Sequence, residues 1–334
     1  MKAFVACPHG VNFDTFFTPE NVALAESLGE ICWKEQSGKL TADDIDERIA
    51  DCDTYITFWG SPKLDEGILA RAPKLKLHTH LCGTVVPVTS DEEWERGIRV
   101  ICGNDWFARS VAEGTVAYIL AALRDIPYFS AKLKGGEWKK QTDTNIGLSG
   151  RKVGIVSYGT IARYLVPLLK PFGCDISVYD IKPLPEEDVK KYGLTQVSLE
   201  ELFSESEIIT LHTPLIDATH HLIGKELLGM IKPGALFVNT SRGAVVDEAA
   251  LVEELKTGRF RAFLDVYEKE PVKPGNPLLE LDNVIMMPHM AGPTVDLRQV
   301  ITKDLLIESA GFIDRGEPLA HEVLRARVEQ MSRR

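Results

Sequence analysis

The sequence predicts an α/β protein that contains two parallel sheets. Short apolar runs alternate with helix-like segments in two separate series, one before residue 105 and one after residue 152. Alternation of this kind indicates parallel strands with helices on both faces of a sheet. A chain of 334 residues is long enough for two domains of ordinary size. We therefore expect each series to form its own sheet.

In the first series, strands and helices can be assigned from apolar runs and from helix-start signals. Thr41 and Asp44 have the spacing of a capping box, in which two side chains satisfy backbone N–H groups at a helix N-terminus. The expected strands are residues 2–7, 54–59, 75–81 and 99–102. The expected helices or helical turns are residues 19–28, 42–52, 65–71 and 91–96.

The second series follows a long, mostly apolar helix at residues 110–124 and a polar stretch at residues 134–150. Pro167 lies inside its first helix, and because proline removes a backbone hydrogen bond we expect this helix to kink or end near Val166. A final amphipathic helix, residues 296–314, returns the chain to the first domain. The expected strands are residues 153–156, 176–179, 207–212, 235–240, 261–266 and 283–287, and the other helices are residues 198–204, 225–230 and 248–256.

The composition excludes several classes of protein. The net charge of −11 argues against sequence-independent binding to nucleic acid or to anionic membranes. No apolar run approaches the ~20 residues that span a bilayer, and the first apolar run is too short for a signal peptide. The six cysteines contain no C-x-x-C pair, which favours buried, reduced thiols. We expect a cytoplasmic protein that binds neither nucleic acid nor membranes.

The stretch from Val153 to Asp180 has the pattern of a βαβ unit that binds a dinucleotide. Its first apolar run ends at a turn around Gly159, where a helix N-terminus can direct N–H groups at a pyrophosphate. The acid that ends the second run is placed to accept hydrogen bonds from ribose hydroxyls. Only one glycine of the G-x-G-x-x-G fingerprint is present, because Ser157 and Ala162 occupy the other two positions. Such a unit can also be purely structural.

Three later loops, each after a strand-like run, contain Arg242, Glu270 and His289. Ligands of an open α/β sheet bind outside the carboxyl ends of the strands, so these three side chains can converge. Histidine is a suitable base for a hydroxyl proton near neutral pH, and a glutamate can fix its tautomer. Arginine can hold a carboxylate through two parallel hydrogen bonds. Together they suit hydride transfer on a 2-hydroxy acid, although each alone could be an ordinary surface or loop residue.

Other polar and aromatic residues are expected to be structural. His78 and His80 lie on a predicted strand, and Trp59 ends another. No group of His, Cys, Asp and Glu has the spacing of metal ligands, so no metal is expected.

The chain resembles the D-isomer-specific 2-hydroxyacid dehydrogenases, most strongly between residues 150 and 294. The resemblance rests on the stretches GRKVGIVSYGTIARYL, LHTPLIDATHHLIGKELLGMIKPGALFVNTSRGAVVDEAALVEELKTG, AFLDVYEKEP and MPHMAG, in this order. Residues 75–150 match more weakly, through LCGT, RGIRV, SVAEGTVAYILA and GEW, and the residues before them match only in pattern.

The resemblance implies a role for each matching residue. His289 would be the general acid/base, Glu270 its partner, and Arg242 the residue that binds and polarises the acid. Asp265 would hydrogen-bond the nicotinamide carboxamide of NAD, and Asp180 the adenine ribose. The pyrophosphate and the remaining cofactor surface would contact Tyr158, Gly159, Thr160, Ile161, His212, Thr213, Pro214 and Thr240.

The substrate pocket is less closely specified. Backbone N–H groups of Cys82, Gly83 and Thr84 would bind the substrate carboxylate. Trp106 stands where relatives commonly have a small, glycine-containing loop, so it either reshapes the pocket or packs the domain hinge. Gly114 replaces a histidine that is usual in the family.

The resemblance also implies two domains and a dimer. A smaller flavodoxin-like domain, residues 1–105 and 296–334, would bind a small 2-hydroxy or 2-oxo acid, and a Rossmann domain, residues 106–295, would bind NAD. Asp180 favours NAD over NADP because its charge would repel a 2′-phosphate, an effect that Lys182 could partly offset. Family members usually form homodimers. Two alternatives remain, an NAD-sensing, corepressor-like protein without significant turnover and a dehydrogenase of the formate or phosphite type.

Overall fold

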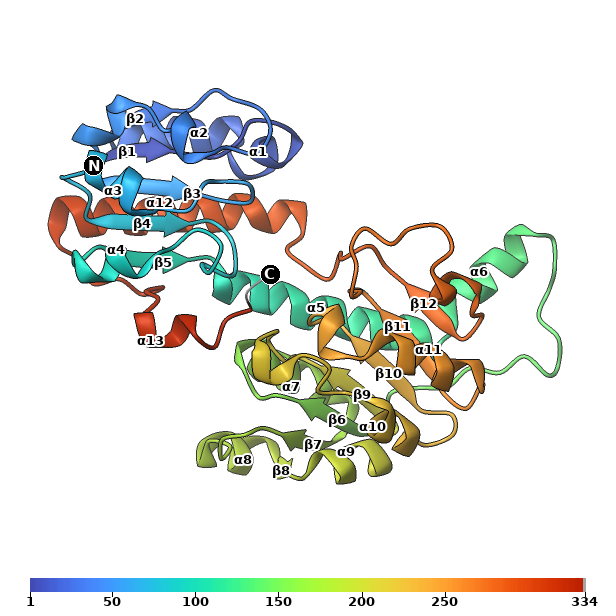
Figure 1. The fold of residues 1–334 in the computed structure, drawn as a ribbon. Helices are drawn as coiled ribbons and strands as arrows, with labels where there is room; N and C mark the ends of the chain where they lie inside the picture. Colours follow the sequence, from blue (N-terminus) through green and yellow to red (C-terminus); the bar gives the residue numbers. More distant parts are fainter. Residues whose placement is uncertain (333–334) are drawn as a thin grey trace. The chain divides into compact units, whose positions relative to one another are not determined.

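The computed structural model describes residues 1–332 and divides the chain into two compact units. The first unit contains residues 1–107 and 293–332, and the second contains residues 108–292. Each unit has its own parallel sheet with helices on both faces (Figure 1). The prediction of an α/β protein with two parallel sheets is therefore confirmed.

The first unit contains a five-stranded sheet in the order β2-β1-β3-β4-β5, with all neighbours parallel. This is the flavodoxin-like strand order. The strands are β1 (Lys2–Val5), β2 (Glu30–Trp33), β3 (Thr54–Thr57), β4 (Leu77–His80) and β5 (Arg99–Cys102). The helices are α1 (Val11–Phe16), α2 (Pro19–Leu28), η1 (Ala42–Asp44), η2 (Glu47–Asp51), α3 (Glu66–Arg71), α4 (Asp91–Glu95), the start of α5 (Asn104–Leu123), α12 (Val295–Arg315) and α13 (Arg325–Val328).

Apolar side chains cover both faces of this sheet, so its central strands β3 and β4 are buried along their whole length. Phe16 and Leu305 belong to the core on one face, and Ile49 and Ile68 belong to the core on the other. Strands of a parallel sheet that are buried on both faces carry few exposed positions. Polar residues on β3 and β4 must therefore find partners inside the protein.

The second unit contains a seven-stranded sheet in the order β12-β11-β10-β9-β6-β7-β8, again all parallel. The strand order reverses between β6 and β9, as in the doubly wound Rossmann fold, where ligands bind at this switch point. The strands are β6 (Lys152–Val156), β7 (Asp175–Tyr179), β8 (Thr195–Gln196), β9 (Ile208–Leu211), β10 (Leu236–Asn239), β11 (Arg261–Leu264) and β12 (Val284–Met286).

Helices cover both faces of the Rossmann sheet (Figure 1). Ala112 and Ile119 of α5 pack on one face with α7, and Leu228 of α10 and Leu251 of α11 pack on the other. In addition to α5, the helices are α6 (Ile126–Lys134), α7 (Thr160–Leu169), η3 (Lys170–Phe172), α8 (Glu186–Tyr192), α9 (Leu199–Glu205), η4 (Asp217–Thr219), α10 (Lys225–Met230), η5 (Gly243–Val245), α11 (Glu248–Lys256) and η6 (Pro277–Glu280).

One local expectation, an early end of the helix that contains Pro167, is wrong. Helix α7 does not end near Val166 but continues past Pro167 to Leu169, whose side chain is fully buried with that of Val166. Burial of this apolar stripe offsets the hydrogen bond that proline removes. Residues 42–52, expected to form a helix or helical turns, contain the two short 3-10 helices η1 and η2.

The predicted capping box is present at η1. The Asp44 carboxylate accepts hydrogen bonds from the backbone N–H and the hydroxyl of Thr41, both at 2.7 Å. These bonds lower the pKa of Asp44 to about 2. The start of this helical segment was thus correctly located, and the capping box opens a short 3-10 helix.

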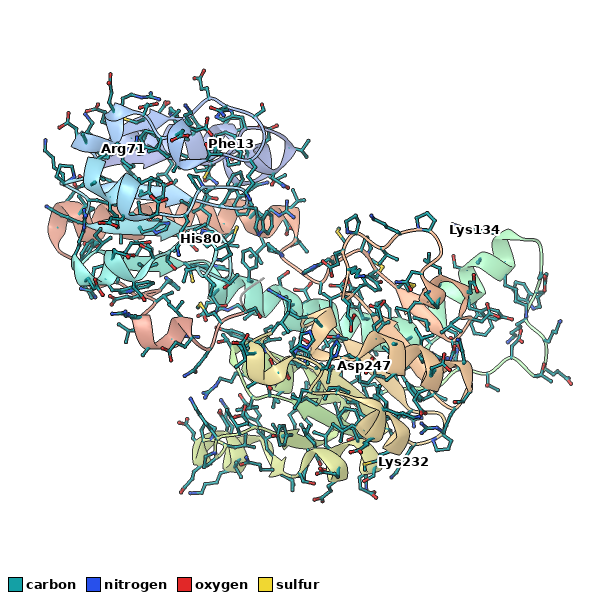
Figure 2. The ribbon with its side chains drawn as sticks, viewed as in Figure 1. Phe13, Arg71, His80, Lys134, Lys232 and Asp247 are labelled. Atoms are coloured by element: carbon teal, nitrogen blue, oxygen red, sulfur yellow. The ribbon has the colours of Figure 1, made fainter. Side chains whose placement is uncertain are left out.

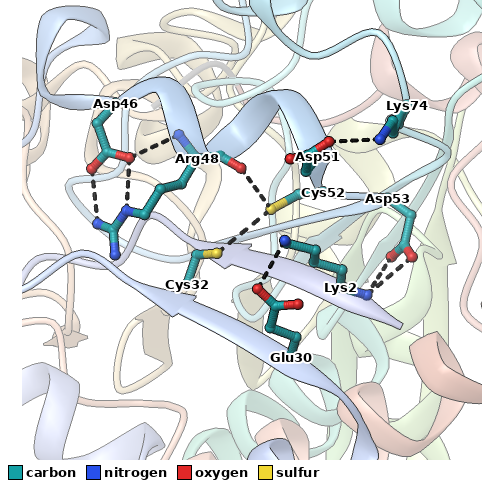
Figure 3. Close-up of polar contacts among 9 residues, drawn as sticks. All are labelled: Lys2, Glu30, Cys32, Asp46, Arg48, Asp51, Cys52, Asp53 and Lys74. Carbon is teal, nitrogen blue, oxygen red and sulfur yellow. Dashed lines mark hydrogen bonds and ion pairs between the residues drawn. The ribbon is translucent and has the colours of Figure 1, made fainter.

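All six cysteines are buried and unbridged. The closest pair, Cys32 and Cys52, has a sulfur–sulfur distance of 3.9 Å beside the Asp46–Arg48 ion pair (Figure 3). Burial, together with the neighbouring Cys32 thiol, raises the pKa of Cys52 to about 12, so this thiol is a poor nucleophile. Within residues 1–332 no helix combines the length and apolar character needed to cross a membrane.

Candidate active site

The turn after β6 is held in an unusual backbone conformation. Ser157 has a φ of 76°, in the left-handed region that favours glycine. Its hydroxyl lies 2.9 Å from the Thr213 hydroxyl, and its N–H donates to the carbonyl of Tyr179 at 2.8 Å. The first fingerprint position therefore does require a positive φ, and a hydrogen-bonded serine adopts it here.

Gly159 follows as the N-cap of α7, which begins at Thr160. Its φ of −83° is ordinary for any residue, and a Cβ built on it would meet no atom within 4 Å. Neither backbone strain nor internal packing demands glycine at this position. An open, side-chain-free approach to the N-terminus of a helix suits an anionic ligand such as a pyrophosphate. Ile161 occupies the next position of the same first turn.

Asp180 ends β7 directly beside this turn. Its carboxylate accepts hydrogen bonds from the backbone N–H groups of Tyr158 at 2.7 Å and Lys182 at 2.9 Å. The acid is thus fixed on the rim of the turn with its charge next to the start of α7. This is the position from which a ribose would be recognised.

The ends of β9 and β10 line the same edge of the sheet. His212 is buried, and burial lowers its pKa to about 3. Its Nε2 atom lies 3.1 Å from the Thr210 hydroxyl, but its buried Nδ1 atom has no hydrogen-bond partner within residues 1–332. The carbonyl of Pro214 accepts from Thr219, and the Thr240 hydroxyl lies 3.0 Å from that of Thr115. An orphaned ring nitrogen at the switch point fits a site that a polar ligand completes.

His289 and Glu270, on loops after β12 and β11, are directly paired. The Nδ1 atom of His289 lies 2.8 Å from Oε2 of Glu270. Burial raises the pKa of Glu270, but hydrogen bonds from His289 and the Tyr267 N–H, together with charge interactions, outweigh it and the pKa is lowered. The glutamate is therefore ionised near neutral pH and holds one ring nitrogen, which leaves the other available for chemistry.

Arg242 lies just beyond the end of β10. Its Nη1 atom donates to the carbonyl of Ser241 at 2.7 Å, and burial lowers its pKa while the charge of Glu270 acts in the opposite direction. The next residue, Gly243, packs so tightly that a Cβ there would come within 1.9 Å of the Tyr267 backbone. This close approach brings the loop after β10 against the loop after β11. The structure thus places Arg242 in the electrostatic field of the His289–Glu270 pair.

Asp265, at the end of β11, anchors the histidine loop. Its side chain is fully buried, and its two oxygens accept from the N–H groups of Met290 at 2.7 Å and Ala291 at 2.9 Å. The Tyr118 hydroxyl donates to the same carboxylate at 3.3 Å. A role in holding the backbone that follows His289 was not apparent from the sequence, because these partners lie far apart in the chain.

The close contact between α5 and the histidine loop was also missed. A Cβ on Gly114 would lie 2.6 Å from the carbonyl oxygen of Ala291, and one on Gly292 would lie 2.8 Å from the Ser110 hydroxyl. Both glycines let the helix touch the loop backbone directly. Gly114 was noted only as a departure from the family pattern, and in this chain a side chain there would collide with the Ala291 backbone.

In the first unit, the loop after β4 is held in place by hydrogen bonds to its carbonyl groups. The Gly103 N–H donates to the carbonyls of His80 at 3.1 Å and Cys82 at 3.0 Å. By contrast, the N–H groups of Gly83 and Thr84 have no acceptor within residues 1–332. Consecutive free N–H groups suit a carboxylate.

The aromatic residues near this loop are mainly packed on one another. The Trp106 ring lies 4.3 Å from the His321 ring, and a Cβ on Gly83 would come within 3.2 Å of Phe107. These contacts support a packing role for Trp106 rather than contact with a substrate. Sequence reasoning did not single out Arg298, whose guanidinium lies 5.0 Å from the centre of the Trp59 ring.

Within residues 1–332, no three His, Cys, Asp or Glu side chains are grouped so that they could hold a metal ion. A histidine with a fixed carboxylate partner, in the same sheet as a dinucleotide turn, can move a proton while a nicotinamide moves a hydride. This arrangement of side chains is that of a nicotinamide-dependent oxidoreductase.

Comparison with known proteins identifies the family. Residues 116–291 match the family described as D-isomer specific 2-hydroxyacid dehydrogenase, NAD binding domain. The chain belongs to the D-isomer specific 2-hydroxyacid dehydrogenases, oxidoreductases that act on CH–OH donors with a nicotinamide cofactor. The predicted family and cofactor class are confirmed.

Among its relatives is a D-3-phosphoglycerate dehydrogenase of Methanocaldococcus jannaschii, with 37% identity over 305 residues that cover 91% of this chain and 57% of that protein. A glyoxylate reductase of Thermococcus litoralis is 34% identical over 315 residues, 90% of this chain and 94% of that protein. The chain thus spans little more than half of the first relative and nearly all of the second. The crystal structure of the TT0316 protein of Thermus thermophilus superposes with a TM-score of 0.78 at 28% identity, covering 97% of this chain and 100% of that one.

Proposed function

We propose that this protein transfers a hydride between NAD(H) and a small 2-oxo or 2-hydroxy acid, with His289 as the general acid/base. The observation that carries the proposal is the 2.8 Å hydrogen bond between Nδ1 of His289 and the Glu270 carboxylate, formed on the loops that follow β12 and β11 of the Rossmann sheet. It fixes the tautomer and orientation of the ring, so Nε2 is the atom that exchanges a proton with the substrate oxygen.

In the direction of reduction, the imidazolium of His289 gives its Nε2 proton to the carbonyl oxygen of the 2-oxo acid. Glu270 stabilises the charged ring before the transfer and orients the neutral ring after it. Arg242 binds the substrate carboxylate and polarises the neighbouring carbonyl. Bound NADH supplies the hydride. In oxidation the neutral ring takes the hydroxyl proton.

The cofactor would lie along the strand ends of the second unit. Gly159 and the N–H groups of Thr160 and Ile161 would bind the pyrophosphate with Tyr158 beside them. His212, Thr213, Pro214 and Thr240 would line the remaining surface, and the orphaned Nδ1 of His212 supports this. Asp180 would bind the adenine ribose and favour NAD over NADP. Asp265 would hydrogen-bond the nicotinamide carboxamide while it keeps its bonds to the histidine loop.

The first unit, with boundaries near residues 105 and 296, would supply the substrate-binding loop and the second unit the cofactor site. The N–H groups of Gly83 and Thr84, with Cys82 beside them, would receive the substrate carboxylate. For Trp106 we favour a packing role against His321 over the predicted contact with the substrate. Glyoxylate and 3-phosphohydroxypyruvate are informative test substrates, because relatives are named for these reactions.

A panel of 2-oxo acids of increasing size, assayed with NADH and with NADPH, tests this proposal. We expect NADH-dependent reduction of at least one small 2-oxo acid and a loss of turnover in His289→Gln. Tight NADH binding without turnover on any acid would instead identify an NAD-sensing protein. Oxidation of formate or phosphite, with no activity on 2-oxo acids, would identify a dehydrogenase of the formate or phosphite type.

We also propose that the protein forms a homodimer through α6 and the segment after it. None of the residues of α6 is buried, and Ile126, Tyr128, Leu133 and Trp138 are each more than half exposed. Lys134 marks the end of this helix in Figure 2. A cluster of exposed apolar residues of this kind is typical of an interface. Leu133→Glu should give a monomer by light scattering, whereas Leu279→Glu, at another exposed position of this unit, should not.

The cytoplasm is the compartment we propose, because six free and buried thiols suit a reducing environment. The test uses protein purified without a reductant. If a thiol-blocking reagent reacts with all six cysteines, and does so only after the protein is unfolded, the proposal is supported. Disulfides in the native protein would contradict it.

A further inference from the structure

Four buried polar side chains, Glu93, His78, Thr57 and His80, form a continuous hydrogen-bonded series in the first unit. The Nδ1 atom of His78 lies 2.8 Å from Oε2 of Glu93, and its Nε2 atom lies 2.8 Å from the Thr57 hydroxyl oxygen. The same oxygen lies 2.9 Å from Nδ1 of His80. The first three side chains are fully buried, and His80 is 3% exposed. The series ends at the last residue of β4, labelled in Figure 2.

The direction of the hydrogen bonds follows from the protons available to each group. Burial lowers the pKa of His80 to about 3, so its ring is neutral and only one of its nitrogens donates. The ring also hydrogen-bonds to the backbone of Thr84, an interaction that raises the pKa and therefore uses an N–H of the ring. The other nitrogen, Nδ1, accepts from the Thr57 hydroxyl. The Thr57 oxygen then accepts from Nε2 of His78, and Glu93 holds the opposite nitrogen of that ring.

This series reaches the loop that carries the free N–H groups. His80 contacts the backbone at Thr84, while the Gly103 N–H holds the carbonyls of His80 and Cys82. The Leu81 N–H donates to the Thr57 carbonyl at 2.8 Å, which ties the loop to β3 as well. The peptide group before Gly83, through the Cys82 carbonyl, and the Thr84 carbonyl are thereby held from inside the sheet.

Stability alone does not account for such a series. Burial of polar groups is costly, and it is offset only when every hydrogen bond is made. Replacement of buried charged or polar groups by apolar residues of similar volume is often neutral or stabilising. A buried series that ends at one particular loop is better explained by what it does to that loop.

We propose that Thr57 and His80 are positioning residues that orient the N–H groups of Gly83 and Thr84 toward the substrate carboxylate. Neither side chain would touch the substrate. This inference rests on the proposed function, in which that loop binds the carboxylate. Its consequence is that the substrate KM depends on a hydroxyl that is fully buried at the end of β3.

The test compares Thr57→Val, Thr57→Ser and Thr79→Val in the full-length protein. Valine matches threonine in shape but removes the central hydroxyl of the series, whereas serine keeps it. Thr79 is the matched control, because it is equally buried on the neighbouring strand and its hydroxyl lies 2.7 Å from that of Ser309, outside the series. Each variant is assayed for KM and kcat with glyoxylate, for NADH binding, and for amide exchange at Gly83 and Thr84.

We expect Thr57→Val to raise KM about tenfold, the equivalent of roughly one lost hydrogen bond, with kcat and NADH binding unchanged. Thr57→Ser should restore the KM of the wild type, and Thr79→Val should not change it. Exchange at Gly83 and Thr84 should be faster in Thr57→Val only. An unchanged KM in Thr57→Val, or an equal rise in Thr79→Val, would overturn the proposal.

The two proposals can fail separately. If the wild type reduces no 2-oxo acid, the proposed function fails, and the exchange rates alone then decide whether the buried series positions the loop. If Thr57→Val does not fold, His80→Asn replaces it, because an asparagine amide can reach Thr57 but not Thr84. A wild-type exchange rate at Thr84 in that variant would exclude a positioning role for His80.

Discussion

His289 and Glu270 form one of two histidine–glutamate pairs in the second unit that are nearly identical in length. Nδ1 of His289 lies 2.8 Å from Glu270, and Nε2 of His221 lies 2.7 Å from Glu268. Both histidines have a positive φ, 57° and 52°. The two pairs differ in the ring nitrogen that contacts the glutamate, which is Nδ1 in His289 and Nε2 in His221. They also differ in their place relative to the strand ends. A histidine–carboxylate pair is therefore not by itself a catalytic signature.

The first prediction uses the second pair as a control. His289→Gln should lower kcat by roughly 10²–10⁴, the contribution of a general acid/base, and leave the NADH dissociation constant nearly unchanged. His221→Gln removes the same kind of ion pair at a similarly exposed position and should leave kcat unchanged. Steady-state kinetics and NADH fluorescence titrations measure both. A wild-type kcat in His289→Gln would refute the proposed mechanism.

Gly114 should be intolerant of a side chain. A Cβ at this position would lie 2.6 Å from the Ala291 carbonyl oxygen, so Gly114→Ala must displace the loop that carries His289. We expect a loss of about 1–3 kcal/mol in the free energy of unfolding, together with a lower kcat. Gly229→Ala, on α10 with no atom within 4 Å of the new Cβ, is the control. Equal effects of the two substitutions in urea denaturation and kinetics would show that the contact with Ala291 is unimportant.

Asp180→Asn should shift cofactor preference toward NADPH. The substitution removes the charge that would repel a 2′-phosphate but keeps an oxygen for the N–H of Tyr158 or Lys182. We expect the ratio of kcat/KM for NADPH to that for NADH to rise at least about tenfold, the effect of roughly 1.4 kcal/mol. Asp175→Asn, at the opposite end of β7, should not change the ratio. No shift in Asp180→Asn would mean that another residue sets the preference.

Ser157 should prefer replacement by glycine to replacement by alanine. Its φ of 76° costs a residue with a Cβ roughly 1–2 kcal/mol, and glycine is free of this cost. Both substitutions lose the hydrogen bond to Thr213, so their difference isolates the backbone term. Urea denaturation should show Ser157→Gly to be more stable than Ser157→Ala by about 1 kcal/mol. The reverse order would show that the turn relaxes when the serine is removed.

Stability should fall as the pH drops below about 6.5, the ordinary pKa of histidine. Burial lowers the pKa of His212 and of His80 to about 3, so the unfolded chain binds protons at these sites at a pH where the folded chain does not. The free energy of unfolding therefore rises with pH between about pH 3 and about pH 6.5. Above about pH 6.5 this contribution to stability is fully present. Each site should cost about 1.4 kcal/mol for every pH unit below 6.5. His212→Asn should remove one of the two contributions, and an unchanged slope would contradict this.

The strand order of both sheets agrees with the fold predicted from the sequence, because alternation of apolar runs and helices admits few other arrangements. Arg242, Glu270 and His289 could be singled out for the same reason, since each directly follows a strand of one parallel sheet. The early end of the helix near Val166 was wrongly expected, because the penalty of a proline is local whereas the burial that offsets it depends on the whole sheet. At residues 42–52 the sequence left helices and helical turns open, and the structure has two short 3-10 helices there.

The sequence alone determined the fold class, the family and the strand ends where polar residues gather, because all three depend on order and periodicity along the chain. Only the tertiary structure decided which polar groups meet. It paired His289 with Glu270 and His221 with Glu268, turned Asp265 toward the histidine loop, and joined Thr57 to both His78 and His80. The physical reason is that a hydrogen bond requires two groups within about 3 Å, and side chains distant in sequence reach that separation only after the sheets have formed.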